Sequence, residues 1–424
     1  MERGFKYMPE KILIIAVKRQ EQTSNYFQST IDELISLSHT AGGEVKKIIT
    51  QNRNHIHPAT YIGRGKIDEI IKNIEENDID LVISNDELSP GQLRNLSDSF
   101  GLKIIDRSQL ILDIFAKRAH TKEGKLQVEL AQLEYLLPRL HGQGIALSRL
   151  GGGIGTRGPG ETKLETDRRH IRRKIDDIKR KLHQVVKNRE QYRKRRKTNN
   201  VFQISIVGYT NAGKSTLFSN LTNSEAYVEN QLFATLDPLT RRIKLPSGFE
   251  TLITDTVGFL QDLPTTLIAA FSSTLEEVRE SDFILHVVDA HHPDEQSQQE
   301  TVLELLHTLE ANTIPILTVY NKKDLVDEDT FIPLQHPHIF MSAFSKDDCK
   351  ILLQTIEDVL KEEWNWYSTE IDSGNGKALH DIQQHTILME RKFNPINSHY
   401  IINGYMRDND PLEEILKEQT NKND

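Results

Sequence analysis

The stretch Gly208–Ser215 reads GYTNAGKS and constrains the fold of this chain more than any other feature. It matches the phosphate-binding pattern G-x-x-x-x-G-K-[ST], follows the apolar run Val201–Val207 and precedes the apolar segment Thr216–Leu221. A strand, such a loop and a helix in succession form a mononucleotide-binding unit, because the glycines let backbone N–H groups face phosphate oxygens. We therefore expect a P-loop domain with a doubly wound, mostly parallel sheet. In it, Lys214 reaches the β- and γ-phosphates and the Ser215 hydroxyl coordinates Mg²⁺.

Two later motifs stand in the order of a guanine-nucleotide site. Asp255-Thr-Val-Gly258 ends an apolar run, where the aspartate can hold Mg²⁺ and the glycine N–H can sense the γ-phosphate. Asn321-Lys322-Lys323-Asp324 follows another apolar run. Its carboxylate can accept hydrogen bonds from the N1–H and N2 amine of guanine, and adenine offers neither donor. The backbone of Ser342-Ala343 is expected to contact guanine O6. The motifs together predict a GTP-binding GTPase.

The γ-phosphate should also be reported by a threonine that binds Mg²⁺ between the phosphate loop and Asp255. Thr235 is favoured and Thr240 is the rival. The residues expected to bind the nucleotide are Gly208, Asn211, Ala212, Gly213, Lys214, Ser215, Thr216, Thr235, Asp255, Gly258, Asn321, Lys322, Asp324, Ser342 and Ala343, with Ser215, Thr235 and Asp255 as the metal ligands.

The residue after the D-x-x-G motif is Phe259. In the best-known small GTPases a glutamine stands there and orients the attacking water, which a phenylalanine cannot do by hydrogen bonding. Lys214, Thr235 and Gly258 can stabilise transferred charge or sense the γ-phosphate, but the group that positions water is not evident. We expect hydrolysis that is slow alone and is accelerated by a partner.

Length and composition bound the rest of the chain. The 424 residues correspond to about three domains. One cysteine cannot form an internal disulfide or a clustered-cysteine zinc site, which favours a reducing compartment. The apolar run Ile12–Val17 is too short to span a bilayer. We expect a cytoplasmic protein, with peripheral contact to a membrane left open.

The pattern outside the P-loop domain predicts three further parts. Residues 1–110 alternate apolar runs with helical spacing, as in a small parallel α/β domain. Residues 111–198 read as a long helical hairpin whose tip, 142–160, holds eight of the 23 glycines. The P-loop domain is expected over 201–363, and 364–424 is expected to form a small α+β tail domain. Within that tail we expect strands at 385–390 and 400–406 and a helix at 411–418.

Charge is distributed unevenly along the chain. Residues 161–197 hold 16 Lys or Arg against 6 Asp or Glu, a net of 16 − 6 = +10, although the whole chain has a net charge of −9. A basic element on an acidic body indicates a local contact with a polyanion such as RNA. The alternatives are a solvated helix with internal ion pairs for the basic segment, and a flexible hinge for the glycine tract.

Several stretches resemble the HflX family, in the Obg–HflX branch of translation-factor-like GTPases. The most specific is Ser148–Arg169, which reads SRLGGGIGTRGPGETKLETDRR. Tyr61–Lys66 (YIGRGK), Phe233–Pro238 (FATLDP) and Asp255–Phe259 (DTVGF) are also similar to stretches of that family. The resemblance covers roughly residues 10–365 and is much weaker in the last sixty.

The resemblance implies a GTPase switch that binds the large ribosomal subunit and splits stalled or idle ribosomes under stress. It also implies that the N-terminal domain and its glycine-tipped hairpin approach ribosomal RNA. We expect a monomer, and some relatives are thought to bind ATP through the N-terminal domain, near Gly63-Arg64-Gly65-Lys66. The arginines expected to contact RNA are Arg149, Arg157, Arg168, Arg169, Arg172, Arg173, Arg193, Arg195 and Arg196. A ribosome-assembly or other RNA-associated GTPase without splitting activity, and an RNA-binding scaffold with an inert nucleotide site, remain as alternatives.

Overall fold

The computed structural model describes residues 9–140, 163–198, 201–223, 232–233, 235–261, 272–327, 331–408, 410 and 412. Packing divides the chain into two compact units. Unit 1 comprises 1–186, 231–237 and 261–272, and unit 2 comprises 187–230, 238–260 and 273–424. The glycine tract 142–160, with Arg149 and Arg157, lies outside the described residues, as does nearly all of the helix expected at 411–418.

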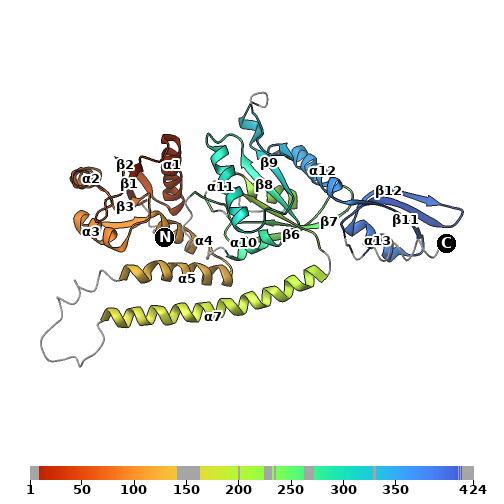
Figure 1. Ribbon diagram of the computed structural model, residues 1–424, viewed down its shortest axis with the longest axis horizontal. Coiled ribbons are helices and arrows are strands. Elements are labelled where there is room, and N and C mark those ends of the chain that lie inside the picture. Colours follow the sequence, from red (N-terminus) through yellow and green to blue (C-terminus); the bar gives the residue numbers. More distant parts are fainter. Residues whose placement is uncertain are drawn as a thin grey trace, which may run out of the picture. The chain divides into compact units, whose positions relative to one another are not determined.

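The core of unit 1 is a four-stranded parallel sheet with the order β2-β1-β3-β4 (Figure 1). Its strands are β1 (Lys11–Arg19), β2 (Glu44–Arg53), β3 (Leu81–Ser84) and β4 (Lys103–Asp106). Strand β1 is apolar throughout its centre because both of its faces are covered. Leu13, Ile15 and Val17 share a core with α2 and α3, and Ala16 packs against α1. The expected parallel α/β domain is confirmed.

Local sequence signals set the helix ends in this domain. Helix α1 (Ser24–Ala41) begins after Thr23, whose side chain accepts a hydrogen bond from an N–H of the first turn, and ends at Gly42 in the left-handed region. Helix α2 (Arg64–Asn77) follows Gly63. Helix α3 (Pro90–Phe100) begins with a capping box between Ser89 and Gln92.

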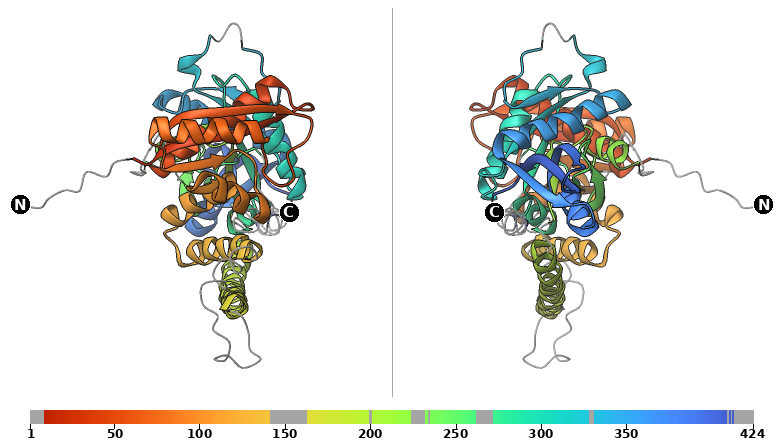
Figure 2. Two further views of the ribbon diagram at one scale, coloured as in Figure 1. Left: turned by 90° about the vertical axis from the view of Figure 1, so that its left-hand side faces the viewer. Right: turned by 90° about the vertical axis from the view of Figure 1, so that its right-hand side faces the viewer.

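The helical stretch from residue 110 to 140 is two helices, α4 (Arg107–Arg118) and α5 (Lys122–Arg139). Helix α7 (Lys163–Thr198) follows and lies beside α5 in both views (Figures 1 and 2). Two ion pairs join them: Lys174 to Glu129 at 2.6 Å and Lys179 to Glu134 at 2.8 Å. Ile175 and Ile178 are buried on the inner stripe of α7.

Residues 232–237 follow the phosphate loop in sequence but pack within unit 1. Phe233 meets Phe115 edge-on, with ring centroids 4.5 Å apart. The Asp237 carboxylate accepts hydrogen bonds from the His120 N–H at 3.0 Å and from the Thr121 N–H and hydroxyl at 2.9 and 2.5 Å. This carboxylate therefore stabilises the start of α5, where unpaired N–H groups favour a negative charge.

Unit 2 contains a six-stranded sheet with the order β10-β9-β8-β5-β7-β6. All neighbours pair in parallel except β6 and β7. The strands are β5 (Gln203–Gly208), β6 (Leu239–Lys244), β7 (Glu250–Asp255), β8 (Phe283–Asp289), β9 (Ile316–Asn321) and β10 (His338–Phe340). The helices that the structure describes in this domain are α8 (Lys214–Thr222), α10 (Ser272–Arg279), α11 (Glu295–Thr308) and α12 (Lys346–Glu363). The expected P-loop architecture is confirmed.

The end of the chain is an antiparallel sheet with the order β11-β13-β12, packed against one helix. Its elements are β11 (Asn365–Asp372), α13 (Gly376–His385), β12 (Ile387–Asn394) and β13 (His399–Met406). Trp364 packs edge-on to Phe202 and Phe249 and so connects this small domain to the core of unit 2. Among the helices that the structure describes, none is long and apolar enough to cross a membrane.

Candidate guanine-nucleotide site

The phosphate loop connects β5 to α8 at the carboxyl edge of the parallel strands, where open α/β sheets bind their ligands. Gly213 closes the loop with φ +98, and a Cβ there would lie 2.1 Å from Nδ2 of Asn321. Glycine is required both by the left-handed backbone and by this close approach. No side chain caps the N-terminus of α8. Its first N–H groups, including that of Thr216, have the orientation that suits a phosphate.

Lys214 is buried within this loop, and its Nζ donates a hydrogen bond to the Tyr209 carbonyl at 2.6 Å. Burial lowers the pKa of this lysine to about 8, although the nearby Asp255 charge acts in the opposite direction. A buried ammonium group is costly unless an anion neutralises it. A phosphate bound beside Lys214 would therefore stabilise the charged form of this buried side chain.

Ser215 and Asp255, two of the expected metal ligands, lie side by side. The serine hydroxyl donates to Oδ2 of the aspartate at 2.8 Å. Asp255 ends β7 and is fully buried. A hydroxyl and a carboxylate are hard oxygen donors of the kind that Mg²⁺ accepts, so this pair fits the metal.

The two candidate switch threonines differ in setting. Thr235 is buried within the segment that packs in unit 1. Thr240 lies in β6, with its hydroxyl 2.9 Å from that of Thr254. The hydroxyl of Thr240 is thus already engaged within the sheet, which favours Thr235 as the metal ligand. The metal role of Thr235 stays a prediction.

The expected guanine-binding residues are held by a hydrogen-bond network around Asn321, at the end of β9. Its Nδ2 donates to the Ala212 carbonyl and its Oδ1 accepts from the Ala343 N–H, each at 2.8 Å. One side chain thus joins the phosphate loop to the Ser342-Ala343 turn. Asp324 lies on the 3₁₀ turn η2 (Lys323–Leu325), exposed to solvent, where a carboxylate can meet a base edge.

Two acidic residues support this network and were not anticipated from the sequence. Asp289 ends β8 and binds Nζ of Lys322 at 2.5 Å. Asp348 accepts the Ser342 N–H at 2.8 Å. The sequence could have indicated Asp289, because a carboxylate at the end of an apolar strand reaches the carboxyl edge of the sheet. Asp348 belongs to α12, and nothing in the local sequence indicated its role.

The D-x-x-G segment is paired with the phosphate loop. The Phe259 N–H donates to the Gly208 carbonyl at 3.1 Å, and the Thr210 N–H donates to the Phe259 carbonyl at 2.8 Å. The Phe259 side chain is 1% exposed. It packs as a core residue, in agreement with the expectation that it does not orient water.

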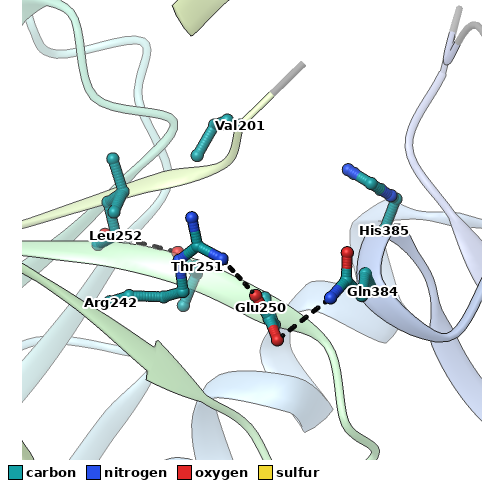
Figure 3. A pocket seen from close by; sticks show the side chains of 7 residues that line it. All are labelled: Val201, Arg242, Glu250, Thr251, Leu252, Gln384 and His385. Atoms are coloured by element: carbon teal, nitrogen blue, oxygen red, sulfur yellow. Dashed lines mark hydrogen bonds and ion pairs between the residues drawn. The ribbon is translucent and has the colours of Figure 1, made fainter. Parts of the chain in front are cut away.

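A separate pocket of about 140 Å³ lies in unit 2 where β6 and β7 approach α13 (Figure 3). Glu250 is its central charge, and it binds Arg242 and Lys244 at 2.9 Å each and Gln384 at 3.2 Å. These cations lower the pKa of Glu250. Through its contact with Gln384, Glu250 connects the small C-terminal domain to the sheet.

The basic face of α7 is a second candidate site. Arg169, Arg172 and Arg173 are exposed, and Arg168 is half-buried on the inner stripe. Arg193, Arg195 and Arg196 lie on the same helix, but their side chains are outside the described part. Lys174 and Lys179 of the same helix form ion pairs with α5.

Known proteins match this chain over nearly its full length. A protein of Alkalihalophilus pseudofirmus named GTPase HflX is 51% identical over 413 residues, 97% of each chain. The chain belongs to the HflX family of GTPases. HflX GTPases of Caldanaerobacter subterraneus and Escherichia coli are 51% and 47% identical, and the matches cover 84% and 70% of this chain and 81% and 70% of theirs. The resemblance seen in the sequence is confirmed.

Three family models match consecutive parts of the HflX chain. They are described as GTP-binding GTPase N-terminal (residues 28–116), GTP-binding GTPase middle region (118–196) and 50S ribosome-binding GTPase (203–322). The chain is thus a GTP-binding enzyme of a ribosome-associated family, and it hydrolyses GTP to GDP and phosphate. The matches give no support for ATP at Gly63–Lys66, so an ATP site there stays a prediction.

Proposed function

We propose that this HflX protein is a GTP-controlled switch that binds the large ribosomal subunit through the basic face of α7 and splits stalled or idle ribosomes. The observation that carries this proposal is the joint presence of an intact guanine-nucleotide site and an exposed arginine face at Arg169, Arg172 and Arg173. The protein acts as a monomer in the cytoplasm, and ribosomal RNA is the polyanion that its basic helix contacts.

The nucleotide site would act as follows. Lys214 and the N–H groups of the phosphate loop hold the β- and γ-phosphates, and Asp324 selects guanine, with Asn321 keeping the two halves of the pocket aligned. Ser215, Thr235 and Asp255 would hold Mg²⁺, which would supply positive charge to offset that of the phosphates when bound. With GTP bound, Thr235 and the Gly258 N–H report the γ-phosphate, and its loss on hydrolysis releases both segments.

The basic face would bind phosphates without reading bases. Arg169, Arg172 and Arg173 lie on one helix, α7, and their side chains are exposed, so they can contact phosphates of an RNA backbone. Binding of this kind is salt-dependent, with a slope of log affinity against log salt of roughly 0.7–0.9 per phosphate contacted.

Co-sedimentation with isolated large subunits tests the proposal. We expect binding with a non-hydrolysable GTP analogue that is tighter than binding with GDP and weakens as salt rises. The triple variant Arg169→Glu, Arg172→Glu, Arg173→Glu should lose most binding and reduce the salt slope by about 2–3. The control variant Lys346→Glu, Lys350→Glu, Lys377→Glu makes the same charge change on exposed residues of unit 2, and it should bind normally.

Equal binding of both triple variants would contradict the RNA role of α7. Equal or absent binding with both nucleotides would contradict a nucleotide-controlled ribosome switch. Sucrose-gradient profiles of whole ribosomes then separate splitting from the alternative, a ribosome-assembly or other RNA-associated GTPase, because only a splitting factor increases free subunits when GTP is added.

A further inference from the structure

The known reaction of this enzyme lacks an assigned group that orients the attacking water. Phe259 occupies the position where a glutamine would do so, and its side chain is buried and apolar. Hydrolysis of GTP depends mainly on positioning and charge, so a hydrogen-bonding group near the γ-phosphate should contribute strongly.

Thr210, the third residue of the phosphate loop, lies against Gly258 and close to Lys214. A Cβ built on Gly258, the predicted γ-phosphate sensor, would lie 2.8 Å from Cγ2 of Thr210 and 2.9 Å from its Cα. The same point is 3.0 Å from Nζ of Lys214. The side chain of Thr210 is therefore in contact with the segment that senses the γ-phosphate and close to the lysine that neutralises it.

The hydroxyl of Thr210 is also unusual among the threonines around it. Thr210 is 7% exposed, and its Oγ1 is buried without a hydrogen-bond partner in the part of the chain that the structure describes. By contrast, the hydroxyls of Thr251 and Thr256 donate to the carbonyls of Phe202 and Ile206 at 2.9 and 2.7 Å. A buried hydroxyl without a partner costs about 1–3 kcal/mol, and a valine of the same shape would avoid this cost.

We propose that the Thr210 hydroxyl is the catalytic group that orients the attacking water. It donates its proton to a γ-phosphate oxygen and accepts one hydrogen bond from the water, which the donor and acceptor capacity of a hydroxyl allows. The water oxygen then forms a bond to the γ-phosphorus, and the bond to the bridging oxygen breaks with its electron pair on GDP. The water proton passes to the phosphate released, so Thr210 is unchanged at the end.

The proposal explains how an enzyme with Phe259 at this position retains hydrolysis. It also gives the close contact of Thr210 with Gly258 a role, because the water must lie between the loop and the N–H that senses the γ-phosphate. A threonine that only fills space would act through its methyl group and its size, not through its hydroxyl. That difference makes the proposal testable.

The test compares Thr210→Val, which removes only the hydroxyl, with Thr210→Ser, which keeps it. Thr222→Val is the matched control, because its hydroxyl donates to the Phe218 carbonyl at 2.7 Å within α8. Single-turnover hydrolysis of GTP by the full-length protein gives the rate, fluorescent GDP and GTP analogues give the affinities, and formation of the GDP–aluminium fluoride complex reports water positioning directly.

We expect Thr210→Val to lower the single-turnover rate by about a hundredfold, as when one preorganised hydrogen bond to a transition state is lost. It should bind GDP and GTP normally and fail to form the aluminium fluoride complex. Thr210→Ser should hydrolyse within about threefold of the natural protein and form the complex. Thr222→Val should match the natural protein in every assay.

Three outcomes would overturn the proposal. The first is a natural rate for Thr210→Val. The second is an equal loss of rate in the valine and serine variants, which would show that side-chain size matters and the hydroxyl does not. The third is a loss of nucleotide affinity with an unchanged rate of the bound state, which would place Thr210 in binding alone. None of these readouts depends on the ribosome, so failure of the ribosome proposal leaves the test intact.

Discussion

Replacing Gly213 by alanine tests whether the phosphate loop and the guanine-binding motif form one site. The new Cβ would lie 2.1 Å from Nδ2 of Asn321, whereas ordinary van der Waals contact begins at 3.4 Å. One side must therefore move by 3.4 − 2.1 = 1.3 Å. Asn321 cannot move that far and keep its hydrogen bonds to Ala212 and Ala343, both at 2.8 Å.

The expected cost has two parts. A residue with a Cβ at φ +98 costs about 1–2 kcal/mol. Loss of the two Asn321 hydrogen bonds costs about 1 kcal/mol each. We expect Gly213→Ala to lower the free energy of unfolding of unit 2 by about 3–4 kcal/mol and to weaken GDP binding by at least about tenfold, because the two halves of the pocket lose their alignment.

Gly248→Ala is the matched control in the same unit. Gly248 has φ +94, but its nearest neighbour is Nε2 of the flexible Gln383 side chain at 3.3 Å. Gly248→Ala should lower the free energy of unfolding only by the backbone cost of about 1–2 kcal/mol, and it should bind GDP normally. Both tryptophans of the chain, Trp364 and Trp366, lie in unit 2, so urea unfolding followed by their fluorescence reports this unit. Equal stability loss in the two variants, with GDP affinity unchanged in both, would refute the reasoning.

Three further predictions follow from single groups. Burial, and to a lesser extent the Lys214 charge, lowers the pKa of His286 to about 4. The contribution of His286 to the free energy of unfolding is therefore complete above pH 6.5 and falls by about 3 kcal/mol as the pH drops to 4. If the pH profile of unfolding were unchanged in His286→Gln, this prediction would be contradicted. The depressed pKa of Lys214, about 8, predicts that GDP binding takes up a proton at pH 8–9, measurable by calorimetry in buffers of different ionisation enthalpy and absent in Lys214→Met. Asp237→Ala should destabilise unit 1 by about 1–2 kcal/mol through loss of its hydrogen bonds to His120 and to Thr121, the N-cap residue of α5, and retention of full stability in denaturant would argue against this role.

The sequence predicted the P-loop domain well because each motif directly follows an apolar strand. Strands β5, β7, β8 and β9 end at Gly208, Asp255, Asp289 and Asn321. Each of these residues therefore lies at the carboxyl end of a strand, and these ends meet at one edge of the sheet. The same pattern of buried strands predicted the N-terminal sheet.

Two strands were not predicted. Strand β6, with the sequence LTRRIK, lies at the edge of its sheet and is mostly exposed, so it lacks an apolar run. One residue, Trp364, separates β11 from the end of α12. The strand alternates buried and exposed residues over NWYSTEID, and no turn signal stands between it and the helix. The predicted strand at 385–390 is in part the end of α13, and β12 starts at Ile387.

Other features depend on contacts between distant parts of the chain and had no local signal. The hydrogen bond from the Thr121 N–H, at the start of α5, to Asp237 joins residues 116 positions apart. The support of Ser342 by Asp348 and the contact of Thr210 with Gly258 become visible only once the loops are in place. Local sequence identified the groups that contact the nucleotide, and tertiary structure identified the groups that hold or assist them.

The most direct test of the account is the rate of GTP turnover with and without isolated large ribosomal subunits. We expect a slow rate alone, on the order of 10⁻⁴ s⁻¹, and stimulation by about 10³-fold or more when subunits are added. The Arg169→Glu, Arg172→Glu, Arg173→Glu variant should keep the slow rate and lose the stimulation. Turnover that is fast without subunits, or that subunits do not change, would contradict the proposal that this GTPase is a switch operated by the ribosome.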